Sequence, residues 1–212
     1  MQSQTNTVML DRVVANRHPI LGMPHTATAF EPLQRPGNRY LLGAQGLYAE
    51  VRRAWLYARF LIAPVDTPYG AVQPMLRSRY RPSPQELEQF TEQAKAAGQL
   101  ETAAWVIWDQ NTEKTRYVAL QARQADSVSL VVDRPALAQG EHLVLDLHSH
   151  HVMDPAFSRT DDEDDLQSRE IKFAAVLGRI DQTQPEWAFR LCVEGHAFYG
   201  QQEPFIEYGD LP

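Results

Sequence analysis

Residues 143–150 read LVLDLHSH, a run in which side chains alternate between two faces as they do in a β-strand. One face of this strand then carries Val144, Asp146, His148 and His150. Because side chains two positions apart in a strand project in the same direction, the imidazoles of His148 and His150 can bind one cation together. The stretch therefore predicts a strand that carries a metal site at its end.

A serine and an aspartate follow the histidine pair at short spacing. Seven residues separate His150 from Ser158, and Asp161 lies three positions further along. We expect a helix to begin here with Thr160 as its N-cap, so that the preceding loop can bring the Asp161 carboxylate to the imidazoles. Two histidine nitrogens and one aspartate oxygen leave a tetrahedral Zn²⁺ ion one open position, as in catalytic zinc sites. Iron or manganese could use the same ligands, but zinc is the metal we predict.

The complete spacing, His-x-His followed by Ser and Asp, resembles the signature of the JAMM family of metallopeptidases, also called the catalytically competent MPN domains. The family has in addition an upstream glutamate that opens a buried strand, and Glu101 in LETAAWVIW matches it. The resemblance implies that one zinc ion is bound by His148, His150 and Asp161. It also implies that Glu101 is the general base, which takes a proton from the attacking water and returns it to the leaving amine, and that Ser158 stabilises the oxyanion.

Three positions depart from the usual family pattern. The family usually has glycine where Ala104 and Trp108 stand, and often proline where His151 follows the second histidine. None of these positions is an expected metal ligand. The resemblance therefore still implies an active enzyme with an α/β fold, in which helices flank a mixed sheet.

The chain divides into an N-terminal β-rich extension with a linker, residues 1–82, and a JAMM/MPN-like domain, residues 83–212. A JAMM domain behind such an extension resembles the A proteins of PRTRC systems, which are gene cassettes of bacterial plasmids and mobile elements. Neighbouring proteins in these cassettes resemble an activating enzyme, a conjugating enzyme and a ubiquitin-like protein. The resemblance implies that the substrate is a ubiquitin-like protein or its conjugate, cleaved at a peptide or isopeptide bond.

Local patterns predict the elements along the chain. Apolar and aromatic residues from 39 to 63 predict two or three antiparallel strands, and residues 64–82 are predicted to be a linker. Ser83 and Glu86 form a capping box that predicts a helix, which ends near Gly98. Three further strands are predicted between this helix and the histidine pair, in AAWVIW, TRYVALQA and VSLVV.

A second amphipathic helix is predicted from Asp161 to Gly178. Four apolar residues would form its buried face: Leu166, Phe173, Ala174 and Leu177. A strand pair is predicted to follow in EWAFRLCVEGHAFYG.

Composition limits the classes of function. A net charge of −7 and a pI near 5.5 argue against general nucleic-acid binding. Cys192 is the single cysteine, so an intramolecular disulfide and a multi-cysteine zinc site are excluded; we expect a buried core thiol. No apolar run is long enough to span a bilayer, and the polar start MQSQTNT lacks the core of a signal peptide. We therefore expect a cytoplasmic protein that does not associate with membranes.

Other zinc enzymes require motifs that this chain lacks. Nucleobase deaminases need His-x-Glu and paired cysteines, and zincins need His-Glu-x-x-His on a helix. The alternative from a different class is a non-catalytic MPN-like scaffold that binds a partner and keeps its metal residues as structural support. Glu101 separates the two hypotheses, because a scaffold does not need a general base.

Overall fold

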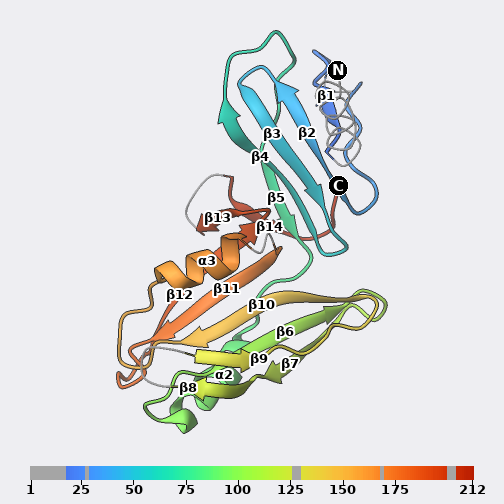
Figure 1. Cartoon of the computed structure of the whole chain (residues 1–212). Helices are drawn as coiled ribbons and strands as arrows, with labels where there is room; N and C mark the ends of the chain where they lie inside the picture. Colours follow the sequence, from blue (N-terminus) through green and yellow to red (C-terminus); the bar gives the residue numbers. More distant parts are fainter. Residues whose placement is uncertain (1–17, 27–28, 126–129, 168–169, 200–203) are drawn as a thin grey trace, which may run out of the picture. The chain divides into compact units, whose positions relative to one another are not determined.

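The computed structural model describes residues 18–26, 29–125, 130–167, 170–199 and 204–212. These residues fold into two compact units (Figure 1). The first unit contains the described residues up to 80 together with those from 204 to 212, and the second contains the described residues from 81 to 199. The predicted mixed α/β architecture is confirmed.

Within its described residues, the first unit is built on a six-stranded sheet of order β1-β2-β3-β4-β5-β14. Its strands are β1 (Ile20–Gly22), β2 (Gly37–Gly43), β3 (Gly46–Arg52), β4 (Leu56–Pro64), β5 (Met75–Ser78) and β14 (Ile206–Tyr208). Strands β2 to β5 pair antiparallel with their neighbours. The prediction of antiparallel strands between residues 39 and 63 is therefore confirmed, whereas the segment predicted to be a linker contains strand β5.

The last strand of the chain returns to the first unit. Strand β14 pairs in parallel with β5, with Ile206 opposite Leu76. Arg77 Nε donates to Glu207 Oε2 at 3.1 Å, and Arg52 Nη1 donates to the carbonyl oxygen of Pro212 at 2.6 Å. The domain boundary predicted at residue 83 assigns β14 to the second domain and not to the first. A strand of three residues is too short to show a recognisable alternation in the sequence.

The second unit is built on a mixed sheet of order β13-β12-β11-β10-β6-β7. Its strands are β6 (Ala103–Asp109), β7 (Lys114–Ala119), β10 (Glu141–Ser149), β11 (Lys172–Gly178), β12 (Glu186–Val193) and β13 (His196–Tyr199). Strands β10 and β11 are parallel, and the other neighbours are antiparallel. A separate hairpin is formed by β8 (Gln121–Ala125) and β9 (Leu130–Asp133).

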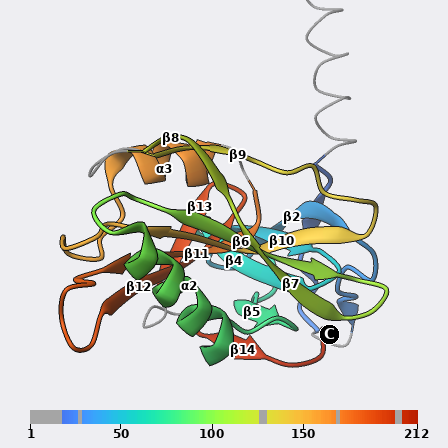
Figure 2. The same ribbon diagram turned by 90° about the horizontal axis from the view of Figure 1, so that it is seen from below.

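Two helices cover opposite faces of this sheet (Figure 2). Helix α2 (Pro84–Ala97) has the predicted capping box, in which Ser83 N donates to Glu86 Oε2 at 2.8 Å and Glu86 N donates to Ser83 Oγ at 3.2 Å. Its Phe90 ring packs on Trp187 of β12 with centroids 5.9 Å apart. Helix α3 (Arg159–Gln167) lies on the other face.

The prediction of a long second helix is wrong. Helix α3 ends at Gln167, and Lys172–Gly178 forms β11, which runs parallel to β10. All seven residues of β11 are buried, and after Lys172 they are apolar residues or glycine on both faces, so the alternation of a half-buried strand is lost. Phe173, Ala174 and Leu177 also have the spacing of one face of a helix. The spacing of apolar residues alone cannot distinguish a buried strand from a helix.

No helix in the described part of the chain is both long and apolar enough to cross a membrane.

Cys192 is fully buried in β12, as predicted. Burial, with a contribution from Asp165, raises the pKa of its thiol to about 12. We predict that the native protein resists an aromatic disulfide reagent at pH 8 and that the thiol reacts once denaturant is added, as followed by absorbance. An exposed thiol ionises near pH 8.5, whereas the buried thiol of Cys192 stays protonated to a higher pH. The contribution of this buried thiol to the free energy of unfolding should therefore be complete below about pH 8.5 and decline above it. Rapid labelling without unfolding would contradict the prediction.

Candidate metal centre

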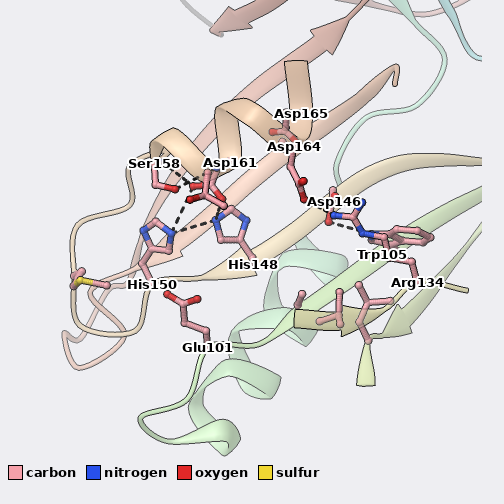
Figure 3. A pocket seen from close by; sticks show the side chains of 16 residues that line it. Glu101, Trp105, Arg134, Asp146, His148, His150, Ser158, Asp161, Asp164 and Asp165 are labelled. Carbon is pink, nitrogen blue, oxygen red and sulfur yellow. Dashed lines mark hydrogen bonds and ion pairs between the residues drawn. The ribbon is translucent and has the colours of Figure 1, made fainter. Parts of the chain in front are cut away.

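The two histidines lie at the carboxyl end of β10. His148 is opposite Ala103 of β6 and Val176 of β11, and His150 follows the last residue of the strand. Their Nε2 atoms are 3.2 Å apart (Figure 3). The strand register therefore directs both imidazoles to one point on the face that α3 covers.

The carboxylate of Asp161 reaches the same point from the first turn of α3. Its Oδ1 lies 3.2 Å from His148 Nε2, and its Oδ2 lies 3.9 Å from His150 Nε2. Ser158, rather than the predicted Thr160, caps the helix: Asp161 N donates to Ser158 Oγ at 3.2 Å, and Ser158 N donates to Asp161 Oδ2 at 2.6 Å. This reciprocal pair is a capping box that has aspartate in place of glutamate, and it holds the carboxylate beside the imidazoles.

The three side chains fit a tetrahedral zinc ion. One ligand atom from each of His148, His150 and Asp161 lies within 4.8 Å of the others. Zinc ligands at about 2.0–2.1 Å from a tetrahedral ion lie about 3.3 Å from one another. The two contacts of 3.2 Å made by His148 Nε2 match that spacing, and the third separation, from His150 Nε2 to Asp161 Oδ2, is wider at 3.9 Å. The nitrogen and oxygen donors are also those that catalytic zinc sites use.

The three groups influence one another's protonation. Burial opposes protonation of His148, but its hydrogen bond to Asp161 and the charge of that carboxylate outweigh burial and raise the pKa of His148. Burial and the neighbouring charge of His148 lower the pKa of His150. Burial opposes ionisation of Asp161, yet the hydrogen bond and charge of His148, with the Ser158 contacts, hold the pKa of Asp161 far below its usual range. The carboxylate is therefore ionised and available as a ligand.

Glu101 is buried just before β6, and its carboxylate points toward the two imidazoles (Figure 3). The next residue, Thr102, is fixed to β10 by Ser149, the residue between the histidines. Thr102 N donates to Ser149 Oγ at 3.1 Å, and Ser149 N donates to Thr102 O at 3.0 Å. Gln93 of α2 adds a hydrogen bond to Thr102 Oγ1 at 2.7 Å. Ser149 and Gln93 thus position the predicted base, a role that sequence reasoning missed.

A cavity of about 470 Å³ opens over these groups. Glu101, His148, His150, Ser158 and Asp161 all line it. Its remaining wall combines apolar and charged side chains: Ala103, Trp105, Leu120, Val132, Arg134, Asp146, Met153, Thr160, Asp164, Asp165 and Ala174. Every site residue predicted from the sequence therefore borders one cavity.

A buried ion network lies beside the candidate metal ligands and was not predicted. Lys172 Nζ lies 2.6 Å from Asp146 Oδ2 and 2.9 Å from Asp165 Oδ1. Arg190 Nη2 lies 2.6 Å from Asp165 Oδ2, and Arg190 Nη1 pairs with Asp162. Burial opposes the charge of Lys172, but Asp146 and Asp165 outweigh it and raise the pKa of that ammonium group. The network joins α3 to β10, β11 and β12.

Asp146 and His151 also lie close to the histidine pair in the sequence. The Asp146 carboxylate accepts hydrogen bonds from Trp105 Nε1 at 3.1 Å and from Lys172 Nζ. These hydrogen-bond donors are not imidazoles. His151 is not among the residues that line the cavity, and its φ is +50°. Proline, which is frequent at this position in the JAMM family, cannot adopt a positive φ, so the turn after β10 differs here.

The model of prokaryotic homologues of the JAB domain matches residues 83–192, which is just over half of the chain. The chain therefore belongs to this family, which is one of JAMM/MPN-type metallopeptidases. A domain of unknown function, DUF2016, matches residues 8–79. No curated protein matches the chain.

The geometry predicts that purified protein contains about one zinc ion per chain. A His148→Ala, His150→Ala variant, prepared in the same way, should contain none, because one carboxylate cannot retain the ion. Elemental mass spectrometry measures both. If neither protein takes up zinc when it is supplied at neutral pH, the assignment of the metal centre is wrong.

Proposed function

We propose that the protein is a zinc-dependent peptidase that hydrolyses a peptide or isopeptide bond. The observation that carries the proposal is the meeting of His148, His150 and Asp161 in one cavity that the buried Glu101 also lines. Zinc sites that have three protein ligands keep a fourth position open for water or substrate. A carboxylate beside that position is the group that a hydrolase needs to move a proton.

The residues divide the proposed reaction between them. A bound Zn²⁺ ion supplies an electrophile that acidifies water and polarises the scissile carbonyl group. Glu101 accepts the proton of the attacking water and delivers it to the leaving amine. Ser158 lies on the cavity wall at the N-terminus of α3, where its hydroxyl can donate to the oxygen that becomes negatively charged. Asp161 stays ionised throughout.

We further propose that the substrate is a ubiquitin-like protein or its conjugate, with its C-terminal tail extended through the cavity. The two family matches place DUF2016 before the JAB domain, and this order supports the resemblance to a PRTRC protein that has an N-terminal extension before its JAMM domain. Activating and conjugating enzymes of such a cassette would then act on the same ubiquitin-like protein in the cytoplasm. This chain would process or deconjugate it.

Glu101→Gln tests catalysis directly. The amide keeps the shape of the side chain but cannot accept a proton, so turnover of a ubiquitin-like fusion substrate should fall about a hundredfold or more. Zinc content, measured on the same preparation, should not change, because Glu101 is not a ligand. Glu92→Gln, at an exposed position of α2, is the matched control. Unchanged turnover in Glu101→Gln would remove the assigned base and favour the non-catalytic scaffold.

Ser158 is expected to contribute to both structure and chemistry. Ser158→Ala removes the helix cap and the oxyanion donor, and we predict a fall in kcat on the order of 10²–10³ with little change in KM. Ser158→Thr keeps a hydroxyl that can fill both roles and should retain most of kcat. Steady-state kinetics on zinc-loaded protein compares the two variants. Equal kcat in Ser158→Ala and wild type would exclude the oxyanion role.

A further inference from the structure

Helix α3 carries the third metal ligand, yet it is not held to the sheet by an apolar face. Its sequence is RTDDEDDLQ, in which Leu166 is the single apolar residue, and Asp165 is its buried residue. Most surface helices of globular proteins dock through an apolar stripe. The contacts that hold α3 on the sheet must therefore be made by charged side chains.

Arg190 of β12 makes those contacts, and its side chain is fully buried. Its Nε and Nη2 donate to Asp165 Oδ2 at 3.1 and 2.6 Å, and its Nη1 donates to Asp162. The guanidinium carbon also lies 3.8 Å from the centroid of the Phe157 ring. One side chain therefore contacts both the helix and the loop that leads into it.

These contacts lie on both sides of residues 158–161, the segment that contains Ser158 and Asp161. Phe157 immediately precedes Ser158, and Asp162 immediately follows Asp161. The Phe157 ring also packs edge-on against His148, with ring centroids 6.5 Å apart. Displacement of Arg190 would release the segment at its start and at its end.

We propose that Arg190 is a positioning residue that sets the metal affinity of the site by holding Asp161 beside the two imidazoles. This inference rests on the proposed function. Lys172 assists from β11, because it shares Asp165 with Arg190 and so neutralises the buried carboxylate. A lysine cannot replace Arg190, since its single ammonium group has neither the planar face for Phe157 nor the fork that spans Asp162 and Asp165.

The test compares wild type with Arg190→Lys and Asp162→Asn. Arg190→Lys keeps the charge, and Asp162→Asn removes the half-exposed partner while leaving the buried Arg190–Asp165 pair intact. Arg116→Lys is the matched control, because Arg116 of β7 also forms a two-bond pair, with Glu141 of β10, but the pair crosses β6 and the Arg116 side chain is half-exposed. Zinc affinity is measured by competition with a chromophoric chelator. The visible spectrum of the Co²⁺-loaded protein reports the coordination geometry, and circular dichroism of the metal-free protein reports folding.

We expect Arg190→Lys to weaken zinc binding about tenfold or more and to change the Co²⁺ spectrum, because supporting residues of metal sites typically contribute 10–100-fold. Asp162→Asn should show a smaller loss in the same direction, and Arg116→Lys should match wild type. If Arg190→Lys does not fold without metal, Asp162→Asn decides. Folded variants with wild-type zinc affinity and an unchanged Co²⁺ spectrum would overturn the inference alone, whereas a wild-type protein that binds no zinc would overturn the proposed function as well.

Discussion

The candidate site depends on the ion pairs that the buried carboxylate of Asp165 forms with two cations. This carboxylate accepts from Arg190 and pairs with Lys172, so two cations from neighbouring strands meet one anion from α3. A buried carboxylate without partners is costly, and a helix so rich in aspartate has little apolar surface to compensate. The ion pairs of Asp165 with Arg190 and Lys172 therefore fix the position of α3 on the sheet. The position of the helix in turn defines where its first turn presents Asp161.

Two serines connect this framework to the candidate site residues Glu101 and Asp161. Ser149 uses its backbone and side chain to bind Thr102, and the neighbouring Glu101 points toward the imidazoles (Figure 3). Ser158 closes the first turn of α3 around Asp161. In both cases a short polar side chain satisfies backbone groups that would otherwise be unpaired at the end of an element. The proposed base and the proposed carboxylate ligand are thus held at the ends of secondary-structure elements, where backbone groups remain available.

Sequence patterns predicted those parts of the molecule that are local. His148, His150 and Asp161 lie within fourteen positions, and the Ser83–Glu86 box spans four, so their geometry follows from short-range rules. Strand β11 was mistaken for helix because burial on both faces removes the alternation that marks a strand. Arg190 stood out in no pattern, since its partner Asp165 is 25 positions away and the alternation of a strand does not show which charged side chain points inward.

The pairing of β14 with β5 also has a consequence for synthesis of the chain. Strand β14 lies near the C-terminal end of the sequence, whereas the other strands of its sheet lie before residue 80. Domains generally fold in the order in which the ribosome releases them. The first unit must therefore wait, with β5 lacking this neighbour, until the second unit has been translated. An unpaired strand edge readily pairs with other chains, and β5 would expose such an edge during this interval.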